Sequence, residues 1–177
     1  MKRILIDMDE VMADAYGKFI QHYTEEFGTI PPERYRGKKI YDLPEAQHMR
    51  DYLYRPNWFA DLAVMPDAVQ VIAALQAQYE IFIVTAAQEF RNCLADKHAW
   101  LSEHFPFIPW RNYVMCGDKS VVTGDYMIDD KASNLAKFSG KGLLFTAPHN
   151  VFEEKYTRVN NWQDVAKFFQ EEANKVL

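Results

Sequence analysis

The chain has 177 residues, of which 49% are hydrophobic and 15% aromatic, and its formal net charge at pH 7 is −5. This length and composition fit one packed domain with at most a small insertion, and they exclude a disordered chain. The acidic balance excludes a broad surface for nucleic-acid polymers, which would be basic. No apolar run approaches the roughly 20 residues of a membrane span, so we expect no membrane partner.

Two features indicate the compartment in which the protein works. Its two cysteines, Cys93 and Cys116, show neither a metal-binding nor a disulfide spacing, which predicts reduced thiols. The first apolar run is too short for the hydrophobic region of a signal peptide, and it ends in an acid. We therefore expect a cytoplasmic protein.

Short apolar runs alternate with helical patterns along the chain. The runs are rich in Ile, Val, Leu and aromatic residues with little polar alternation, which is typical of parallel strands covered on both faces. This alternation predicts an α/β fold, a Rossmann-like doubly wound parallel sheet. In chain order we expect a strand at 3–6, a helix at 67–78, a strand at 81–84, a helix at 88–104, strands at 113–115, 126–128 and 143–145, and a helix at 162–174.

One interval, residues 15–65, interrupts the alternation. It contains helical and loop patterns but no convincing strand, and Pro31, Gly37 and Pro44 are among the residues that break it into short segments. We predict a small helical insertion after the first strand. The α/β core would then consist of residues 1–14 and 66–177.

Polar side chains gather where the predicted strands end. Ligand sites in open α/β sheets lie beyond the carboxyl ends of the strands, so these side chains are the candidates for a functional site. They are Asp7 and Asp9 after the first strand, Thr85 and Ala86 after the second, Lys119 just past the third, and Asp129 and Asp130 after the fourth.

These residue types suit phosphoryl transfer. Carboxylates from two strand ends can hold Mg²⁺, which prefers oxygen ligands, and the ion would offset both their repulsion and the charge of a phosphate. One Asp can act as a nucleophile and form an aspartyl-phosphate, while a second Asp exchanges a proton with the leaving oxygen and with water. A threonine hydroxyl and a lysine ammonium can bind the phosphoryl oxygens.

The same motifs carry a family resemblance. The string "DMDEVMAD", Thr85, Lys119 and the pair Asp129 and Asp130 resemble, in order, the four motifs of the haloacid dehalogenase superfamily of phosphatases. Three longer strings, "DKHAWLSEHF", "DKSVVTGDYMIDDK" and "LLFTAPHN", resemble the 5′(3′)-deoxyribonucleotidase branch more specifically. The resemblance covers essentially the whole chain. It implies a Mg²⁺-dependent phosphatase that dephosphorylates deoxynucleoside monophosphates through an aspartyl-phosphate, and it suggests a homodimer.

The resemblance also implies a role for each motif residue. Asp7 would be the nucleophile and a Mg²⁺ ligand, and Asp9 would be the acid/base, which binds the metal through its backbone carbonyl. Asp130 would ligate Mg²⁺ directly, with Asp129 in support. The insertion at 15–65 would be a cap that covers the site and selects the substrate. Phosphate binding is implied for Thr85, Ala86, Lys119 and for Lys131, which stands where the branch often has Arg.

The chain departs from the branch pattern at several positions. Glu10 stands where the first motif usually has Gly, and we expect an ordinary turn there with Glu10 pointing outward. Ala15 follows the last Asp of the motif, where the branch usually has an aromatic residue, and Tyr16 comes next. Lys38 and Lys39 stand after Arg-Gly, where the branch has an aromatic pair that contacts the nucleobase. The core chemistry is therefore better supported than the nucleotide specificity.

Five residues in or beside the insertion have two possible uses. Tyr16, Tyr41, Trp58 and Phe59 could stack on a base in a substrate pocket, and plain packing within the insertion is the alternative. Asp14 is expected to cap the helix that follows it or to hydrogen-bond the catalytic loop.

Two other functions stay open. A phosphatase for another small phosphate ester, such as a sugar phosphate, would fit the lysine pair of the insertion. A catalytically silent binding protein with the same fold is the other alternative, and the complete set of motif residues argues against it. Either enzyme would act on a small-molecule phosphate ester.

Overall fold

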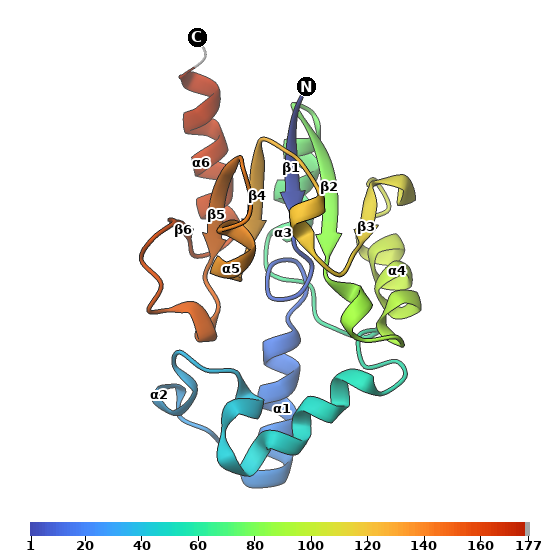
Figure 1. The fold of residues 1–177 in the computed structure, drawn as a ribbon, viewed down its shortest axis with the longest axis vertical. Helices are drawn as coiled ribbons and strands as arrows, with labels where there is room; N and C mark the ends of the chain where they lie inside the picture. Colours follow the sequence, from blue (N-terminus) through green and yellow to red (C-terminus); the bar gives the residue numbers. More distant parts are fainter. Residues whose placement is uncertain (176–177) are drawn as a thin grey trace.

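A computed structural model describes residues 1–175 (Figure 1). Its centre is a six-stranded sheet in the order β3-β2-β1-β4-β5-β6, and every neighbouring pair is parallel. The strand order reverses on either side of β1, as in a doubly wound Rossmann-like fold, which confirms the predicted fold class. The strands are β1 (Lys2–Ile6), β2 (Tyr79–Thr85), β3 (Tyr113–Met115), β4 (Tyr126–Asp129), β5 (Lys141–Phe145) and β6 (Thr157–Val159).

The strand β6 was not predicted from the sequence. It is three residues long, lies at the edge of the sheet and, among residues 1–175, pairs only with β5. Its first two side chains, Thr157 and Arg158, are polar, so the segment lacks the apolar run that marks the buried strands. The five predicted strands are confirmed, with β1, β2, β4 and β5 extending slightly beyond the predicted ranges.

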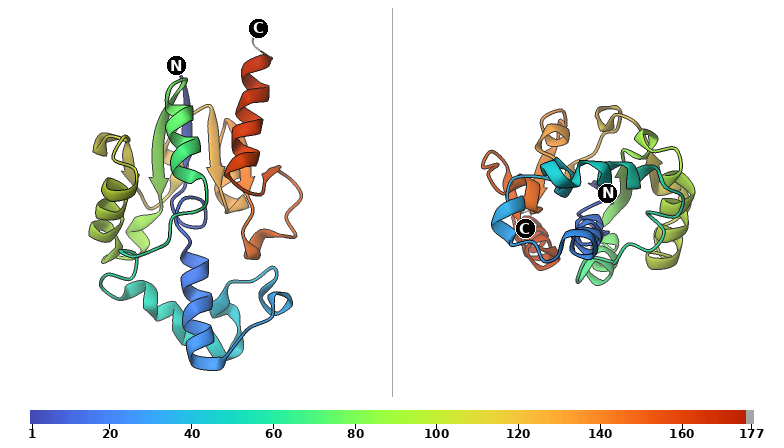
Figure 2. Two further views of the ribbon diagram at one scale, coloured as in Figure 1. Left: turned by 180° about the vertical axis from the view of Figure 1, so that it is seen from behind. Right: turned by 90° about the horizontal axis from the view of Figure 1, so that it is seen from below.

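Helices cover both faces of the sheet, and alternate strand residues supply the two cores. Ile4 and Ile6 of β1 join the core under α3 (Ala68–Gln76) and α6 (Trp162–Asn174), which lie together on one face (Figure 2). Leu5, between them, points to the other face and packs with Leu135 of α5 (Ala132–Leu135). This alternation follows from the two-residue period of a strand.

One predicted core helix differs clearly at its first residues, and the short helix α5 was not predicted. The helix expected at 88–104 begins at Cys93 as α4 (Cys93–His104), because residues Ala87–Glu89 form a separate 3₁₀ turn. Further 3₁₀ turns lie at Trp110–Asn112, Lys119–Val121 and Pro148–Asn150. No helix within residues 1–175 has the length and apolar character that a membrane crossing requires.

Residues 15–65 lie beyond the carboxyl ends of the strands, at the bottom of Figure 1. They form helices and turns, as predicted, and an aromatic contact between Phe19 and Trp58, with ring centroids 4.8 Å apart, belongs to their core. Asp14 caps the first helix by accepting a hydrogen bond from Gly17 N at 2.7 Å, which confirms one of its two expected uses. The elements are α1 (Ala15–Phe27), α2 (Pro32–Tyr35) and 3₁₀ helices at Ile40–Asp42 and Pro44–Tyr54.

The insertion is attached to the core on two sides. On one side, Gly37 N donates to Pro148 O at 2.8 Å, and the Arg36 guanidinium lies 5.2 Å from the Phe152 ring centroid. On the other side, Asn92 Nδ2 donates to Tyr54 O at 2.6 Å. A pocket beside the insertion is lined by residues that follow β1, β2 and β4. That the insertion forms a separate cap stays a prediction.

Candidate active site

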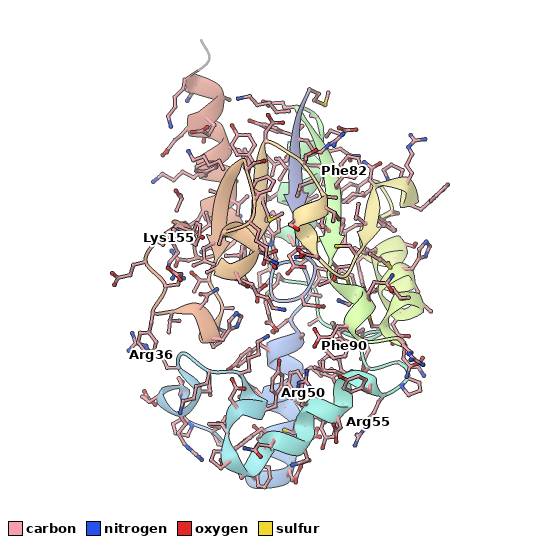
Figure 3. The ribbon with its side chains drawn as sticks, in the orientation of Figure 1. Arg36, Arg50, Arg55, Phe82, Phe90 and Lys155 are labelled. Atoms are coloured by element: carbon pink, nitrogen blue, oxygen red, sulfur yellow. The ribbon has the colours of Figure 1, made fainter. Side chains whose placement is uncertain are left out.

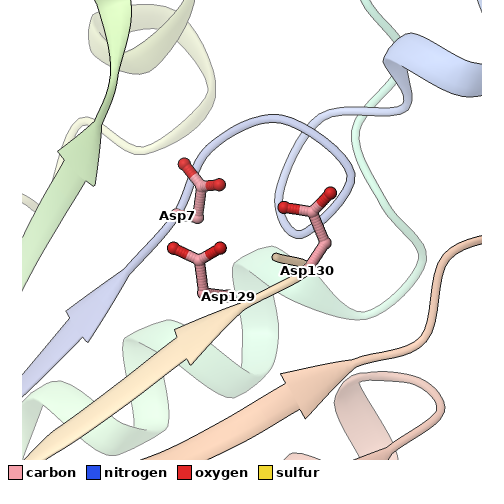
Figure 4. Close-up of side chains that lie close together, drawn as sticks. All are labelled: Asp7, Asp129 and Asp130. Atoms are coloured by element: carbon pink, nitrogen blue, oxygen red, sulfur yellow. The ribbon is translucent and has the colours of Figure 1, made fainter. Parts of the chain in front are cut away.

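Three carboxylates meet at the ends of β1 and β4. Oxygen atoms of Asp7, Asp129 and Asp130 lie within 4.8 Å of one another (Figure 4), and all three residues are buried. They meet because β1 and β4 are parallel neighbours, with Ile6 paired to Ile128, and the chain leaves both strands at the same edge. The sequence predicted these acids at strand ends, and the order of the strands in the sheet brings them together.

Lys119 lies inside this carboxylate cluster. Its Nζ is 2.7 Å from Asp7 Oδ1 and 2.6 Å from Asp129 Oδ2, and the residue is 4% exposed. Burial alone would lower the pKa of Lys119, but the attraction of Asp7 and Asp129 outweighs it and raises the pKa above its ordinary value. For Asp7, burial is the largest effect and raises the pKa, with Lys119 opposing it. The ammonium therefore offsets part of the repulsion among the acids.

The free oxygens of the cluster fit a hard cation. Asp130 Oδ1 is buried and has no hydrogen-bond partner among residues 1–175. The contacts described for Asp7, with Lys119 Nζ and Met8 N, both use Oδ1, which leaves Oδ2 for a ligand. An orphaned buried carboxylate oxygen beside a second free one is the donor chemistry that Mg²⁺ prefers.

Both carboxylate oxygens of Asp129 accept hydrogen bonds from neighbouring residues. Oδ1 accepts from Lys131 N at 2.8 Å, Oδ2 accepts from Lys119 Nζ, and Asn134 Nδ2 lies 3.0 and 3.1 Å from the two oxygens. This saturation fits the supporting role expected for Asp129 better than direct ligation.

His149 adds a partner that the sequence did not reveal. Its Nε2 lies 3.1 Å from Asp130 Oδ2, at ion-pair distance but without the alignment of a hydrogen bond. Burial pushes the pKa of Asp130 upward, but His149, Lys39 and Lys131 outweigh that effect and lower the pKa. The string "LLFTAPHN" contained His149, but nothing in its spacing indicated a contact with Asp130.

A pocket lies between this cluster and the insertion. Glu10 and Lys39 bring an acid and a cation to its wall, and Arg50 of the insertion pairs with Glu89 of the core at 3.2 Å. In Figure 3, Arg50 and Phe90 lie where the insertion faces the core. The other residues that line the pocket include Asp7, Asp9, Tyr16, Tyr41, Phe59, Ala86, Lys119, Asp130, Lys131 and Asn134.

A family model described as "5′ nucleotidase, deoxy (Pyrimidine), cytosolic type C protein" matches residues 1–174. The chain belongs to this nucleotidase family. The predicted family resemblance and the enzyme class, a phosphoric monoester hydrolase, are thereby confirmed.

Relatives of this nucleotidase family match over nearly their whole length. A Bacillus subtilis protein named 5′(3′)-deoxyribonucleotidase is 35% identical over 173 residues, which cover 94% of this chain and 98% of that protein. A Staphylococcus epidermidis protein, provisionally given the same name, is 41% identical over 171 residues, covering 95% of this chain and 96% of the relative.

Solved structures support the fold alone. A haloacid dehalogenase-like hydrolase from Streptococcus pneumoniae has a TM-score of 0.61 at 14% identity, covering 96% of this chain and 99% of that chain. A Bacillus subtilis hydrolase of the same type, solved with magnesium bound, has a TM-score of 0.55 at 12% identity, covering 96% and 99%.

The prediction for Glu10 in the nucleotidase motif was wrong. The residue has φ 64°, is 7% exposed and lines the pocket, and its carboxylate accepts from Tyr16 N at 3.2 Å. The loop folds back on itself, with Ala13 N donating to Met8 O at 2.9 Å and Glu10 N donating to Ala13 O at 2.8 Å. This tight turn requires the left-handed conformation at residue 10 and directs the side chain inward.

The structure separates the aromatic pocket candidates. Tyr16, Tyr41 and Phe59 line the pocket, whereas Trp58 packs between Phe19 and Phe59 and is absent from the lining. Packing within the insertion is therefore the observed use of Trp58.

The two lysines that replace the aromatic pair also differ. Lys38 is exposed, and its backbone carbonyl accepts from Tyr16 Oη at 2.6 Å, so its side chain does not line the pocket. Lys39 does line it, with Nζ 5.8 Å from the Tyr41 ring centroid. Only one of the two positions brings a positive charge to the substrate side.

Sequence reasoning missed Lys97. It is 1% exposed on α4, and its Nζ lies 2.5 Å from Asp9 Oδ2 and 2.9 Å from Thr85 Oγ1. A signal was present, because a lysine stands on the helix face that otherwise carries the buried residues Cys93, Trp100 and Leu101.

Proposed function

We propose that this protein is a Mg²⁺-dependent phosphatase that dephosphorylates deoxynucleoside monophosphates through an aspartyl-phosphate on Asp7. The observation that carries the proposal is the buried cluster of Asp7, Asp129 and Asp130 with Lys119 at its centre, opening onto a pocket that Asp9 also lines. Three acids gathered at the carboxyl ends of neighbouring strands have no evident structural use, because their mutual repulsion destabilises the fold.

Asp7 and Asp130 would hold the metal through side-chain oxygens, and Asp9 would add its backbone carbonyl. The free Asp7 Oδ2 and the orphaned Asp130 Oδ1 support this assignment. When bound, Mg²⁺ would neutralise phosphate charge and allow a carboxylate to approach it. Asp129 would keep Lys119 and the Asp130 loop in place through its hydrogen bonds.

The reaction would proceed in two halves. In the first, a carboxylate oxygen of Asp7 forms a bond to phosphorus as the ester P–O bond breaks, and Asp9 gives its proton to the departing oxygen. In the second, Asp9 takes a proton from water, whose oxygen attacks phosphorus and releases phosphate and free Asp7. Phosphoryl oxygens would be bound by Lys119, Thr85, Ala86 and Lys131.

The names of the Bacillus subtilis and Staphylococcus epidermidis relatives support a deoxynucleotide as the substrate. Within the pocket, Tyr16, Tyr41, Phe59 and Phe90 offer aromatic surface for a base. We also propose that residues 15–65 act as a cap over this pocket, in a cytoplasmic and homodimeric enzyme.

One observation favours a second candidate function. Lys39 brings a cation to the pocket wall, where it would suit a more anionic ester such as a sugar phosphate. Burial opposes the charge of Lys39, but nearby Tyr41, Asp130 and Glu10 raise its pKa, so it stays positive. The two candidates share the chemistry of Asp7 and differ in the group beyond the phosphate.

A panel of phosphate esters distinguishes the candidates. The proposed function predicts that dUMP and dTMP are hydrolysed with kcat/KM at least about tenfold above that of glucose 6-phosphate, because base stacking adds about 1–3 kcal/mol. Phosphate release in the presence of Mg²⁺ measures each value. Equal or faster hydrolysis of the sugar phosphate would contradict the nucleotide assignment and favour the second candidate.

A further inference from the structure

Lys97 is a buried charged residue that the proposed mechanism leaves without a task. Its side chain is 2% exposed, on a face of α4 (Cys93–His104) where Trp100 and Leu101 are also buried. Lysine at such a position is rare, because a buried ammonium loses its hydration and is costly without partners. Its partners therefore indicate why the residue is there.

Both partners of Lys97 belong to the proposed catalytic site. Nζ donates to Asp9 Oδ2 at 2.5 Å and to Thr85 Oγ1 at 2.9 Å. Asp9 lies in the loop after β1, and Thr85 is the last residue of β2. One buried cation thus connects the proposed acid/base with a proposed phosphate ligand.

The contact with Asp9 restricts its carboxyl group. The terminal torsion of an aspartate is broad, so an unheld carboxyl rotates over a wide range. Lys97 holds Oδ2, which leaves Oδ1 as the oxygen that exchanges a proton. Proton transfer in a transition state depends on this kind of placement.

The contact with Thr85 sets the direction of its hydroxyl hydrogen. An ammonium has donors and no acceptor, so Thr85 Oγ1 must accept from Lys97. The hydroxyl hydrogen is then directed to another acceptor. In the proposed reaction, a phosphoryl oxygen of the substrate is that acceptor.

Lys97 also connects the site to the insertion. Its Nζ lies 4.8 Å from the ring centroid of Phe59, which is 2% exposed. The ring excludes water from the ammonium, and the less polar surroundings strengthen the contact with Asp9. The insertion thereby affects the proposed acid/base without supplying a reacting group.

We propose that Lys97 is a positioning residue, which holds Asp9 for proton transfer to the leaving group and directs the Thr85 hydroxyl to the phosphate. The inference rests on the proposed function of the same site. In the step that it serves, Asp7 bonds to phosphorus, the ester P–O bond breaks, and the Asp9 proton moves to the departing oxygen, which leaves as an alcohol.

Two substrates with different leaving groups test this role. The sugar alkoxide of dUMP needs a proton as it leaves, whereas the p-nitrophenolate of p-nitrophenyl phosphate is stable without one. In Lys97→Met we expect kcat/KM to fall at least about 100-fold for dUMP but less than about tenfold for p-nitrophenyl phosphate. The ratio of the two kcat/KM values reports the transfer of the phosphoryl group to Asp7, because both substrates form the same intermediate and its hydrolysis is common to them.

Lys18→Met is the matched control. Lys18 is also a lysine beside an aromatic ring of the insertion, with Nζ 5.1 Å from the Trp58 ring centroid, and it pairs with Asp61. Its substitution should leave both kcat/KM values unchanged. Lys97→Arg keeps the charge, but a planar guanidinium cannot reproduce both contacts of an ammonium, so it should show the same selectivity to a smaller extent.

If Lys97→Met folds poorly, as a lowered melting temperature of that variant would show, the same comparison is made with Lys97→Arg. Equal losses for the two substrates in the folded variants would show a purely structural lysine and overturn the proposal, as would unchanged kcat/KM. A wild-type protein that hydrolyses neither substrate would overturn the proposed function, and this inference with it.

Discussion

At the scale of single residues, the site divides into groups that a sequence pattern reveals and groups that it does not. Asp7 and Thr85 each follow an apolar run directly, so their position at a strand end is visible in the sequence. Lys97 lies in the middle of a helix, and its contact with Asp9 spans 88 positions of the chain. The inward direction of the Glu10 side chain was not predicted, because it follows from backbone hydrogen bonds within its own loop.

Glu10 makes stability depend on pH. Burial is the largest effect and raises its pKa well above 4.5, with Asp130 adding to the rise and Lys39 opposing it. A raised carboxyl pKa means that the folded state binds more protons than the unfolded chain as pH rises above 4.5, so stability falls over that range. Each pKa unit of the rise corresponds to about 1.4 kcal/mol.

Glu10→Gln removes this ionisation and keeps the size of the side chain. We expect the variant to gain stability over the wild type as pH rises from 5 to 8. Urea unfolding in the presence of EDTA at both pH values measures the difference. Glu33→Gln, at an exposed position of α2, is the control for the substitution itself. A constant difference between wild type and Glu10→Gln at the two pH values would contradict the assignment.

At the scale of elements, apolar runs identify the strands of the buried sheet, and β6 shows the limit of that signal. Edge strands are covered on fewer sides, so they need fewer apolar residues. The short segment Thr157–Val159 is a strand because it pairs with β5, although its composition does not indicate one. Helix starts are also poorly marked. The segment before α4 contains helix-compatible residues, but a 3₁₀ turn at Ala87–Glu89 follows the end of β2 there.

The attachment of the insertion gives a prediction at this scale. Gly37 has φ 77°, and a Cβ there would lie 2.4 Å from Cε2 of Phe152, an exposed residue outside the insertion. Gly28 has φ 83°, but a Cβ there would meet nothing within 4 Å. Gly37→Ala and Gly28→Ala therefore share a backbone cost of about 1–2 kcal/mol, and only Gly37→Ala displaces Phe152.

We expect Gly37→Ala to lose about 1 kcal/mol more unfolding free energy than Gly28→Ala, since its hydrogen bond to Pro148 is also disturbed. Because this attachment holds the insertion over the pocket, KM for dUMP should rise several-fold in Gly37→Ala alone. Urea unfolding and steady-state kinetics measure the two effects. Matching behaviour of the two variants would show that the attachment does not position the insertion.

At the scale of the whole molecule, the arrangement follows from parallel strands and one insertion. Parallel strands bring Asp7 and Asp130 to the same end of the sheet, and the insertion after β1 lies beyond that end (Figure 1). Aromatic side chains of the insertion line the pocket there. The sheet and its catalytic edge are predictable because both follow from local runs and strand ends. The lining of the pocket is predictable only in part, because loops bring Lys39 and Glu10 to its wall.

Asp7 is proposed to carry the phosphoryl group during the reaction, and a labelling experiment can detect that intermediate. The protein is mixed with dUMP that carries a radioactive phosphate, quenched in acid and analysed for protein-bound label. We expect label on Asp7 that requires Mg²⁺ and decays in alkali as an acyl phosphate does. The label should be absent from Asp7→Asn, which should also lose turnover while its melting temperature shows that it remains folded. Turnover near the wild-type rate in Asp7→Asn, with no label on the wild-type protein, would contradict this role of Asp7.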